Sequence, residues 1–230
     1  MAELPAKARP GGDLVTRTLS ALLMAPVALA ATYFGTPYFE ILVAIGAGIA
    51  LGEWSGLRLP GVGKGGWITV GFAYIVLPGL ALVWLRAHPT LGLETVFWLM
   101  AVVWATDIGA YAAGRLIGGP KLAPALSPKK TWAGLLGGMA CAAAVGIVTA
   151  DLVGKESGIA LASLSAATAA LAQGGDLFES WVKRRSGAKD SGTIIPGHGG
   201  ILDRIDGLLA AAAAIALIEL VSGGKVLAWL

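Results

Sequence analysis

Apolar stretches long enough to cross a membrane recur along the whole chain. Of its 230 residues, 56% are hydrophobic and 13% are charged, whereas a soluble domain usually carries about 25% charged residues. Gly is frequent, at 34 residues, and Gly is commoner in membrane helices than in soluble ones. The sequence therefore predicts an all-α, polytopic integral membrane protein.

Seven of these stretches are predicted to be membrane spans, within a range of six to nine. A helix needs about 20 residues to cross the hydrocarbon core, and the first, second and last stretches are shorter than that. The predicted spans are residues 19–34, 37–53, 67–85, 95–113, 132–150, 158–175 and 207–221. We divide the chain into N-terminal spans, residues 1–95, and a catalytic membrane region, residues 96–230.

The first stretch has a second interpretation. Arg17, the apolar run after it and Ala28-Leu29-Ala30 imitate a signal peptide with its cleavage site. A first membrane helix is favoured, because the other spans require insertion into the membrane in any case.

The basic residues alternate with the predicted spans. With the N-terminus inside the cell, the inner segments hold fourteen Lys and Arg residues and the outer segments hold three. Cytoplasmic loops of membrane proteins carry such an excess of Lys and Arg. We therefore expect a multi-pass protein of the cell inner (cytoplasmic) membrane, with its C-terminus outside and its charged loops facing the cytoplasm.

One inner loop follows an acidic residue inside an apolar helix. The carboxylate of Asp107 is costly at that position unless it is paired or bound to a cation. The loop ends in Ser127-Pro-Lys129-Lys130-Thr131, directly before the next span. A helix start offers free N–H groups that suit phosphate, although an ordinary positive-inside anchor accounts equally well for this segment taken alone.

The second charged loop is denser. Asp176, Ser180 and Lys183 are spaced to share one helix face, and Asp203 and Asp206 are spaced to share another. Five of the 14 acidic residues lie between positions 176 and 206. Carboxylates bind Mg²⁺, which usually keeps substrate phosphates as further ligands, and Lys and Arg neutralise the remaining phosphate charge. A purely structural network of salt bridges would leave the glycines beside His198 unexplained.

These residues resemble the phosphatidate cytidylyltransferase family, also called CDP-diglyceride synthases. The family signature reads Ser-x-x-Lys-Arg, Lys-Asp-x-Gly and Pro-x-His-Gly-Gly-x-x-Asp-Arg-x-Asp. It is matched by Ser180, Lys183, Arg184, Lys189, Asp190, Gly192, Pro196, His198, Gly199, Gly200, Asp203, Arg204 and Asp206. The segments around Asp107 and Ser127 also look like the family's, whereas the first hundred residues match only as apolar spans.

The resemblance implies a reaction between two anionic substrates, CTP and phosphatidic acid. A phosphate oxygen of phosphatidic acid attacks the α-phosphorus of CTP and expels pyrophosphate, which gives CDP-diacylglycerol for phospholipid biosynthesis. The attacking phosphate is already ionised near neutral pH, so the site needs no strong general base. It must hold the two substrates together and stabilise the charge on the leaving group.

The resemblance also implies roles for individual residues. Asp176 and Asp203 are expected to be the first ligands of one or two Mg²⁺ ions, with Asp107 and Asp206 as further ligands and a monovalent cation as an additional candidate. The predicted catalytic groups, which would contact phosphates, are Lys183, Arg184, Lys189, His198 and Arg204. The predicted substrate-binding groups are Ser127, Lys129, Lys130, Thr131, Ser180, Gly199 and Gly200.

Two other functions compete with this one. A CDP-alcohol phosphotransferase also works at this interface with Mg²⁺ and carboxylates, but the sequence after Asp107 departs from that family's pattern. An anion transporter tends to show internal repeats and charges at the membrane midplane, whereas the charges here gather on one face.

The remaining expectations concern partners. Besides the two substrates we expect membrane lipids and no nucleic acid. A homodimer is possible, because Gly137-Gly138 and the run 210–214 would allow helices to pack closely. Glu53, at the inner end of the second span, either lines the site or reaches from the helix end toward water.

Overall fold

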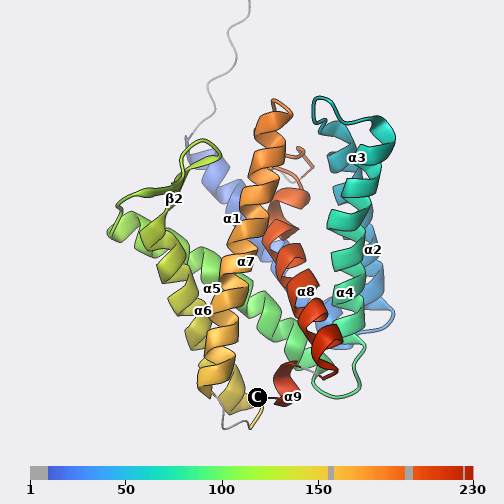
Figure 1. Cartoon of the computed structure of the whole chain (residues 1–230), viewed down its shortest axis with the longest axis vertical. Coiled ribbons are helices and arrows are strands. Elements are labelled where there is room, and N and C mark those ends of the chain that lie inside the picture. Colours follow the sequence, from blue (N-terminus) through green and yellow to red (C-terminus); the bar gives the residue numbers. More distant parts are fainter. Residues whose placement is uncertain (1–9, 155–157, 195–198, 225, 230) are drawn as a thin grey trace, which may run out of the picture.

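Each predicted span corresponds to one long helix of the computed structural model, which describes residues 10–154, 158–194, 199–224 and 226–229. The second span starts one residue early, because Pro37 is the N-cap of its helix. One long helix contains a π-helical turn, η1, between α3 and α4 (Figure 1). The elements are α1 (Pro10–Phe34), α2 (Tyr38–Gly56), α3 (Lys64–Gly71), η1 (Phe72–Val76), α4 (Leu77–Arg86), α5 (Gly92–Leu116), β1 (Lys121–Ala123), β2 (Ser127–Thr131), α6 (Trp132–Leu152), α7 (Gly158–Arg185), α8 (Leu202–Ser222) and α9 (Val226–Trp229).

The prediction of an all-α, polytopic membrane protein is confirmed. Five helices of the described chain are long and apolar enough to cross a membrane: α2, the continuous helix Lys64–Arg86, α5, α6 and α8. In α1, the described apolar part is Leu22–Phe34, which is shorter than these five helices. The α7 helix continues ten residues past its predicted span, from position 175 to Arg185, and this extension carries the first charged residues of the second loop, from Asp176 to Arg185.

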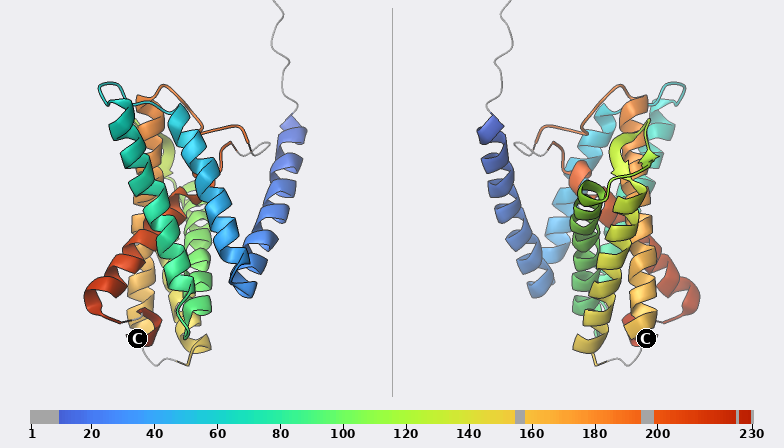
Figure 2. Two further views of the ribbon diagram at one scale, coloured as in Figure 1. Left: turned by 90° about the vertical axis from the view of Figure 1, so that its right-hand side faces the viewer. Right: turned by 90° about the vertical axis from the view of Figure 1, so that its left-hand side faces the viewer.

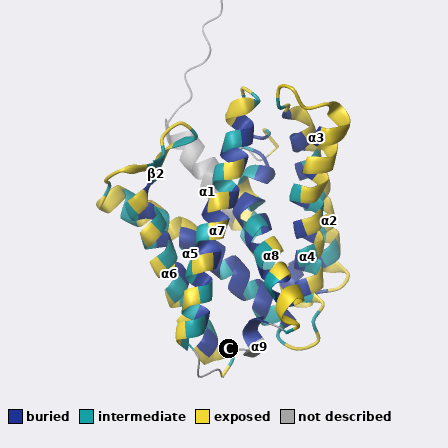
Figure 3. Ribbon diagram, in the orientation of Figure 1, coloured by how far each residue is buried: buried dark blue, intermediate teal, exposed yellow. Residues whose placement is uncertain are grey.

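The helices run side by side, and the charged loops meet at one end of the bundle (Figures 1 and 2). The hairpin β1–β2, the end of α7 and the start of α8 all lie toward that end. Figure 2 shows α1 joined to α2 at the opposite end and leaning away from it toward the charged end. Many large apolar side chains are exposed on the outside of the bundle (Figure 3), which is the surface that lipid would cover.

Glycines bring α5 and α6 into backbone contact. A Cβ at Gly109 would lie 2.7 Å from the carbonyl oxygen of Gly137, and a Cβ at Gly138 would lie 2.8 Å from that of Thr106. Small residues allow membrane helices to approach this closely. The pair Gly137-Gly138, considered above as a dimer contact, is thus used to pack two helices of the same chain.

Two tryptophans fasten α2 to α3. Trp54 Nε1 donates a hydrogen bond to the carbonyl of Trp67 (3.0 Å), and Trp67 Nε1 donates one to the carbonyl of Trp54 (3.1 Å). Their rings stack with centroids 4.2 Å apart, and a stacked pair adds to the stability gained from burial. The C-terminal end of α2 is therefore held in a defined position.

The loop between the fourth and fifth predicted spans contains a short antiparallel hairpin, which we did not predict. Lys121 pairs with Thr131, and Ala123 pairs with Ser127. The hairpin was hard to see because three prolines, at positions 120, 124 and 128, interrupt any alternation of apolar and polar residues. It places the basic Ser127–Thr131 segment beside the start of α6 rather than in an open loop.

Candidate active site

A polar cavity of about 430 Å³ lies among α5, α7 and α8, near the charged end of the bundle. It includes all four predicted metal ligands, together with two of the predicted catalytic cations. The lining residues are Val103, Asp107, Ala172, Gln173, Asp176, Glu179, Lys183, Asp190, Asp203, Arg204, Asp206 and Gly207. Residues from both predicted motifs, far apart in sequence, therefore meet in one place.

The α7 helix presents the polar face that its spacing predicts. Ser180 Oγ donates to Asp176 Oδ1 (3.3 Å) one turn earlier. Lys183 lies on the same side, and its ammonium contacts Glu179 Oε2 at 2.6 Å. Glu179, whose residue is 1% exposed, is a member of the site that sequence reasoning missed. Its position one turn before Lys183 was the available signal.

Asp203, in the first turn of α8, is held by several donors. Lys183 Nζ lies 2.5 Å from Asp203 Oδ1. On the other oxygen, Oδ2 accepts hydrogen bonds from the backbone N–H groups of Gly200 (2.8 Å) and Ser191 (3.0 Å). Lys183 thus stands between two carboxylates, one on α7 and one on α8, and joins the two helices electrostatically.

Asp107 and Asp206 approach the cavity from α5 and α8. The amide of Gln173 donates to Asp107 Oδ1 at 3.5 Å, which is the far limit for such a bond. Asp206 is buried, and its Oδ1 accepts from the N–H of Gly207 (2.7 Å). A Cβ at Gly175 would lie 2.9 Å from the Asp206 carbonyl, so this glycine lets α7 and α8 come close enough for their carboxylates to share the cavity.

The hairpin supplies one further cation. Lys130 Nζ lies 2.6 Å from Asp176 Oδ2, which links β2 to α7. Thr131 has a structural position, because its Oγ1 accepts from the N–H of Gly134 and caps the start of α6 (3.0 Å). Lys129 is exposed on β2, and Ser127 is partly buried where the strand begins.

Other predicted residues lie outside the cavity lining. Arg184 is exposed, and its guanidinium donates to the carbonyls of Leu126 and Ala188, both at 3.4 Å. Lys189 is exposed in the loop that follows α7. Gly199 has a positive φ of 84° and a Cβ there would lie 2.8 Å from Asp203 Oδ2. His198 lies outside the described residues.

The donor set suits a hard cation. Every carboxylate of the cavity offers oxygen ligands, which Mg²⁺ prefers, and Glu179 Oε1 is buried with no hydrogen-bond partner among the described residues. As they lie, no three acidic, His or Cys residues of the described chain are grouped closely enough to ligate a metal. Two of the carboxylates are instead paired with ammonium groups. Lys130 contacts Asp176, and Lys183 contacts Asp203.

Glu53 reaches this end of the molecule from the N-terminal half. It does not extend toward water, because it is buried at 7% exposure and contacts the loop before α8. The sequence left its role open because its partners lie 138 to 149 positions away.

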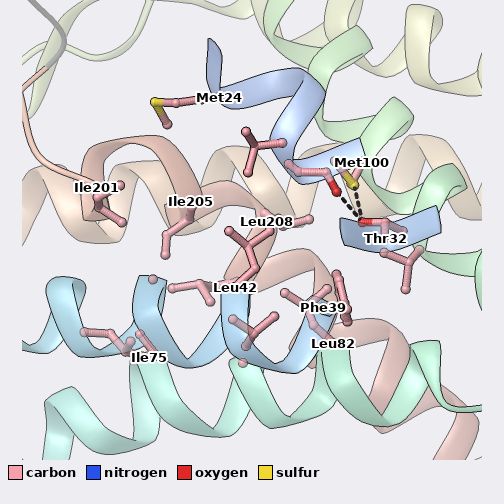
Figure 4. A pocket seen from close by; sticks show the side chains of 18 of the residues that line it. Met24, Thr32, Phe39, Leu42, Ile75, Leu82, Met100, Ile201, Ile205 and Leu208 are labelled. Atoms are coloured by element: carbon pink, nitrogen blue, oxygen red, sulfur yellow. Dashed lines mark hydrogen bonds between the residues drawn. The ribbon is translucent and has the colours of Figure 1, made fainter. Parts of the chain in front are cut away.

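A second cavity, of about 390 Å³, lies on the other face of α8 and is almost wholly apolar (Figure 4). Ile201, Ile205 and Leu208 of α8 face side chains of α1, α2, α4 and α5 across it. At its far end Thr32 Oγ1 bonds to the carbonyl of Ala28 (2.8 Å) and contacts Met100 Sδ, so its hydroxyl is satisfied.

The sequence matches a known family over most of its length. Residues 61–221 match the model of the cytidylyltransferase family. A protein of Rickettsia bellii (strain RML369-C) named phosphatidate cytidylyltransferase is 33% identical over 221 residues, which cover 93% of this chain and 94% of that protein.

Two other relatives match a shorter part of the chain at higher sequence identity. A phosphatidate cytidylyltransferase of Brucella suis biovar 1 (strain 1330) is 51% identical over 152 residues, or 66% of this chain, and the chain spans 56% of the length of that relative. One of Haemophilus influenzae (strain ATCC 51907 / DSM 11121 / KW20 / Rd) is 46% identical over 128 residues, which cover 54% of this chain and 44% of that protein. Because the family match covers well over half of the chain and the Rickettsia relative aligns along nearly all of it, the chain belongs to the cytidylyltransferase family.

Proposed function

We propose that this protein transfers the cytidylyl group of CTP to phosphatidic acid, forming CDP-diacylglycerol and pyrophosphate. The observation that carries the proposal is the polar cavity, in which carboxylates from α5, α7 and α8 meet Lys183 and Arg204 at one end of a membrane bundle. The names of the relatives support the same substrates.

The position of the cavity suits one soluble and one membrane-bound substrate. The excess of Lys and Arg on the charged loops favours the cytoplasmic side of the cell inner membrane. CTP would enter from water, while the acyl tails of phosphatidic acid remain in the bilayer. A transporter is less well supported, because its charges would be expected near the midplane.

The cations of the site would draw the two phosphates together. Lys183 and Arg204 line the cavity, and Lys130 pairs with Asp176 of its lining, so these cations would contact phosphate oxygens. Asp176 holds Lys130, and Asp203 holds Lys183. An oxygen of the lipid phosphate would attack the α-phosphorus of CTP. The bond from the α-phosphorus to the bridging oxygen then breaks, and that oxygen leaves with pyrophosphate. Positive groups that face the developing charge lower the barrier of such a step.

Mg²⁺ is part of the proposal. Asp176 and Asp203 are its first candidate ligands, with Asp107 and Asp206 beside them. We add Glu179, whose Oε1 has no hydrogen-bond partner in the described part of the chain. When bound, the ion would neutralise phosphate charge and polarise the α-phosphoryl group. Lys130 and Lys183, which pair with Asp176 and Asp203, would contribute positive charge beside the substrate phosphates.

The test uses purified protein in detergent with phosphatidic acid, labelled CTP and Mg²⁺. We expect CDP-diacylglycerol and pyrophosphate from the wild type, and a large loss with Asp176→Asn or Asp203→Asn. Asp151→Asn, at the opposite end of α6, is the matched control and should keep full activity. Failure of the well-folded wild type to use any lipid phosphate would contradict the proposal. Release of CMP from CDP-diacylglycerol would favour the phosphotransferase instead.

A further inference from the structure

The residue at the N-cap position of α8 provides no side-chain cap. It is Ile201, whose apolar side chain makes no hydrogen bond to the first N–H groups of the helix. The first N–H groups of a helix have no partner inside the helix and need an acceptor from elsewhere. This helix start matters because Asp203 and Asp206 follow it within a turn and a half.

Glu53 provides the missing acceptors from another helix. Its Oε1 accepts from the N–H of Ile201 and its Oε2 accepts from the N–H of Leu202, both at 2.9 Å. A carboxylate is also favoured here by the positive end of the helix dipole. The buried charge of Glu53 is therefore compensated by α8 itself.

The loop before α8 is shaped around this carboxylate. A Cβ at Gly192 would lie 2.5 Å from Glu53 Oε1, and a Cβ at Gly200 would overlap both Glu53 Oε2 and Ser191 Oγ. These two glycines leave space for the carboxylate, which explains two glycines of the signature without a substrate contact.

The same contacts continue to Asp203. Ser191 Oγ lies 3.1 Å from Glu53 Oε2 and 2.9 Å from Asp203 Oδ2. A hydroxyl has a single proton and donates to one acceptor at a time. Ser191 Oγ thus stands between the two carboxylates and donates to one of them at a time, while the Ser191 N–H donates to Asp203 Oδ2 (3.0 Å).

Glu53 is itself firmly placed. It precedes Trp54, whose reciprocal hydrogen bonds with Trp67 fix the C-terminal end of α2 against α3. We propose that Glu53 is a positioning residue of the active site, which caps α8 from α2 and, through Ser191, sets Asp203 for the reaction. This role rests on the proposed function.

Glu53→Gln is the main test, and it should reduce the rate rather than substrate binding. The side-chain amide of Gln has only one acceptor oxygen. Its NH₂ group would face the backbone N–H of Ile201 or Leu202, so at least one of the two hydrogen bonds is lost. A displacement of 1 Å in an active site can cost about a hundredfold in rate. We expect kcat to fall by about that factor, with KM for CTP changed less than about threefold. Glu40→Gln changes a carboxylate at the other end of the same helix and should leave both constants unaltered.

Ser191→Ala separates the two parts of the network. It removes the hydroxyl between the carboxylates but keeps both backbone bonds to Glu53 and both to Asp203. We expect a smaller loss of kcat, about tenfold, which corresponds to one hydrogen bond to a charged group.

Hydrogen exchange provides a measurement that does not depend on activity. The amides of Gly200, Ile201 and Leu202 should exchange faster in Glu53→Gln, while those in the middle of α7 keep their protection. Faster exchange with unchanged kcat would reduce Glu53 to a structural cap and overturn the proposal, as would unchanged exchange. A wild type that forms no product overturns the proposed function instead, and exchange alone then decides whether Glu53 caps α8.

Discussion

The two faces of α8 line two cavities of similar volume and opposite character. One face carries Asp203 and Asp206 and contributes to a cavity of about 430 Å³ with five carboxylates from α5, α7 and α8. The other carries Ile205 and Leu208 and lines an apolar cavity of about 390 Å³. A single helix thus separates a charged compartment from an apolar one.

This difference shows that the volume of a cavity does not by itself identify the candidate active site. The polar cavity contains poorly exposed charges, and bringing each of them out of water costs desolvation energy that a partner must offset. The apolar cavity requires no such pairing, and its lining stabilises the bundle by contact alone. Changes on the polar face should therefore alter chemistry, and changes on the apolar face should alter stability.

Lys183→Met should give the largest effect. It removes the ammonium between Glu179 and Asp203, so two poorly exposed carboxylates lose the cation that neutralises them. Breaking a buried pair from one side costs about 3–5 kcal/mol, so both the free energy of unfolding and the activity should fall. Denaturation in detergent and the product assay measure the two, with Lys64→Met on α3 as the exposed control. Unchanged stability would show that the pair does not join α7 to α8.

Leu209→Ala tests the apolar face of the same helix. Leu209 is 3% exposed and lines the apolar cavity. Loss of a buried leucine side chain should cost about 2–5 kcal/mol of unfolding free energy, while kcat of the folded protein stays at the wild-type value. A drop in kcat without loss of stability would break the proposed division between the two faces.

Lys130→Gln should have an intermediate effect on the polar side. The ion pair with Asp176 is partly exposed, so the loss of stability should stay below about 1 kcal/mol. We expect activity to fall about tenfold, equivalent to about 1.4 kcal/mol in the transition state. Lys121→Gln, on the other strand of the hairpin, is the control. Equal losses in both variants would point to general surface charge, and added salt would then reproduce the effect.

Gly46→Ala should produce the smallest change. Gly46 lines the apolar cavity within α2, and a Cβ there meets no atom within 4 Å. Replacing a helical glycine by alanine should stabilise the protein by about 0.5–1 kcal/mol. The thermal midpoint in detergent should rise with no change in product formation, and a fall would mean that the cavity is narrower than its lining indicates.

The sequence predicted the helices well because membrane spans are set by hydropathy, a local property. It also predicted that Asp176 and Lys183 share a face, which helical periodicity determines. It did not predict the pairing of Lys183 with Asp203, because several arrangements of a charged loop satisfy the same composition. The contact of Glu53 with Leu202 was missed for a related reason, since a bond between residues 149 positions apart leaves no local pattern.

The contact between Glu53 and the start of α8 has a consequence for the order in which the protein assembles. Neighbouring helices such as α5 and α6 can associate as soon as both have been synthesised, since local contacts form early and distant ones late. The carboxylate of α2 must wait for α8, the last long helix of the described chain. A growing or truncated polypeptide therefore lacks both the capped helix and two aspartates of the cavity. We therefore expect no product from a nascent chain in which α8 has not yet entered the membrane.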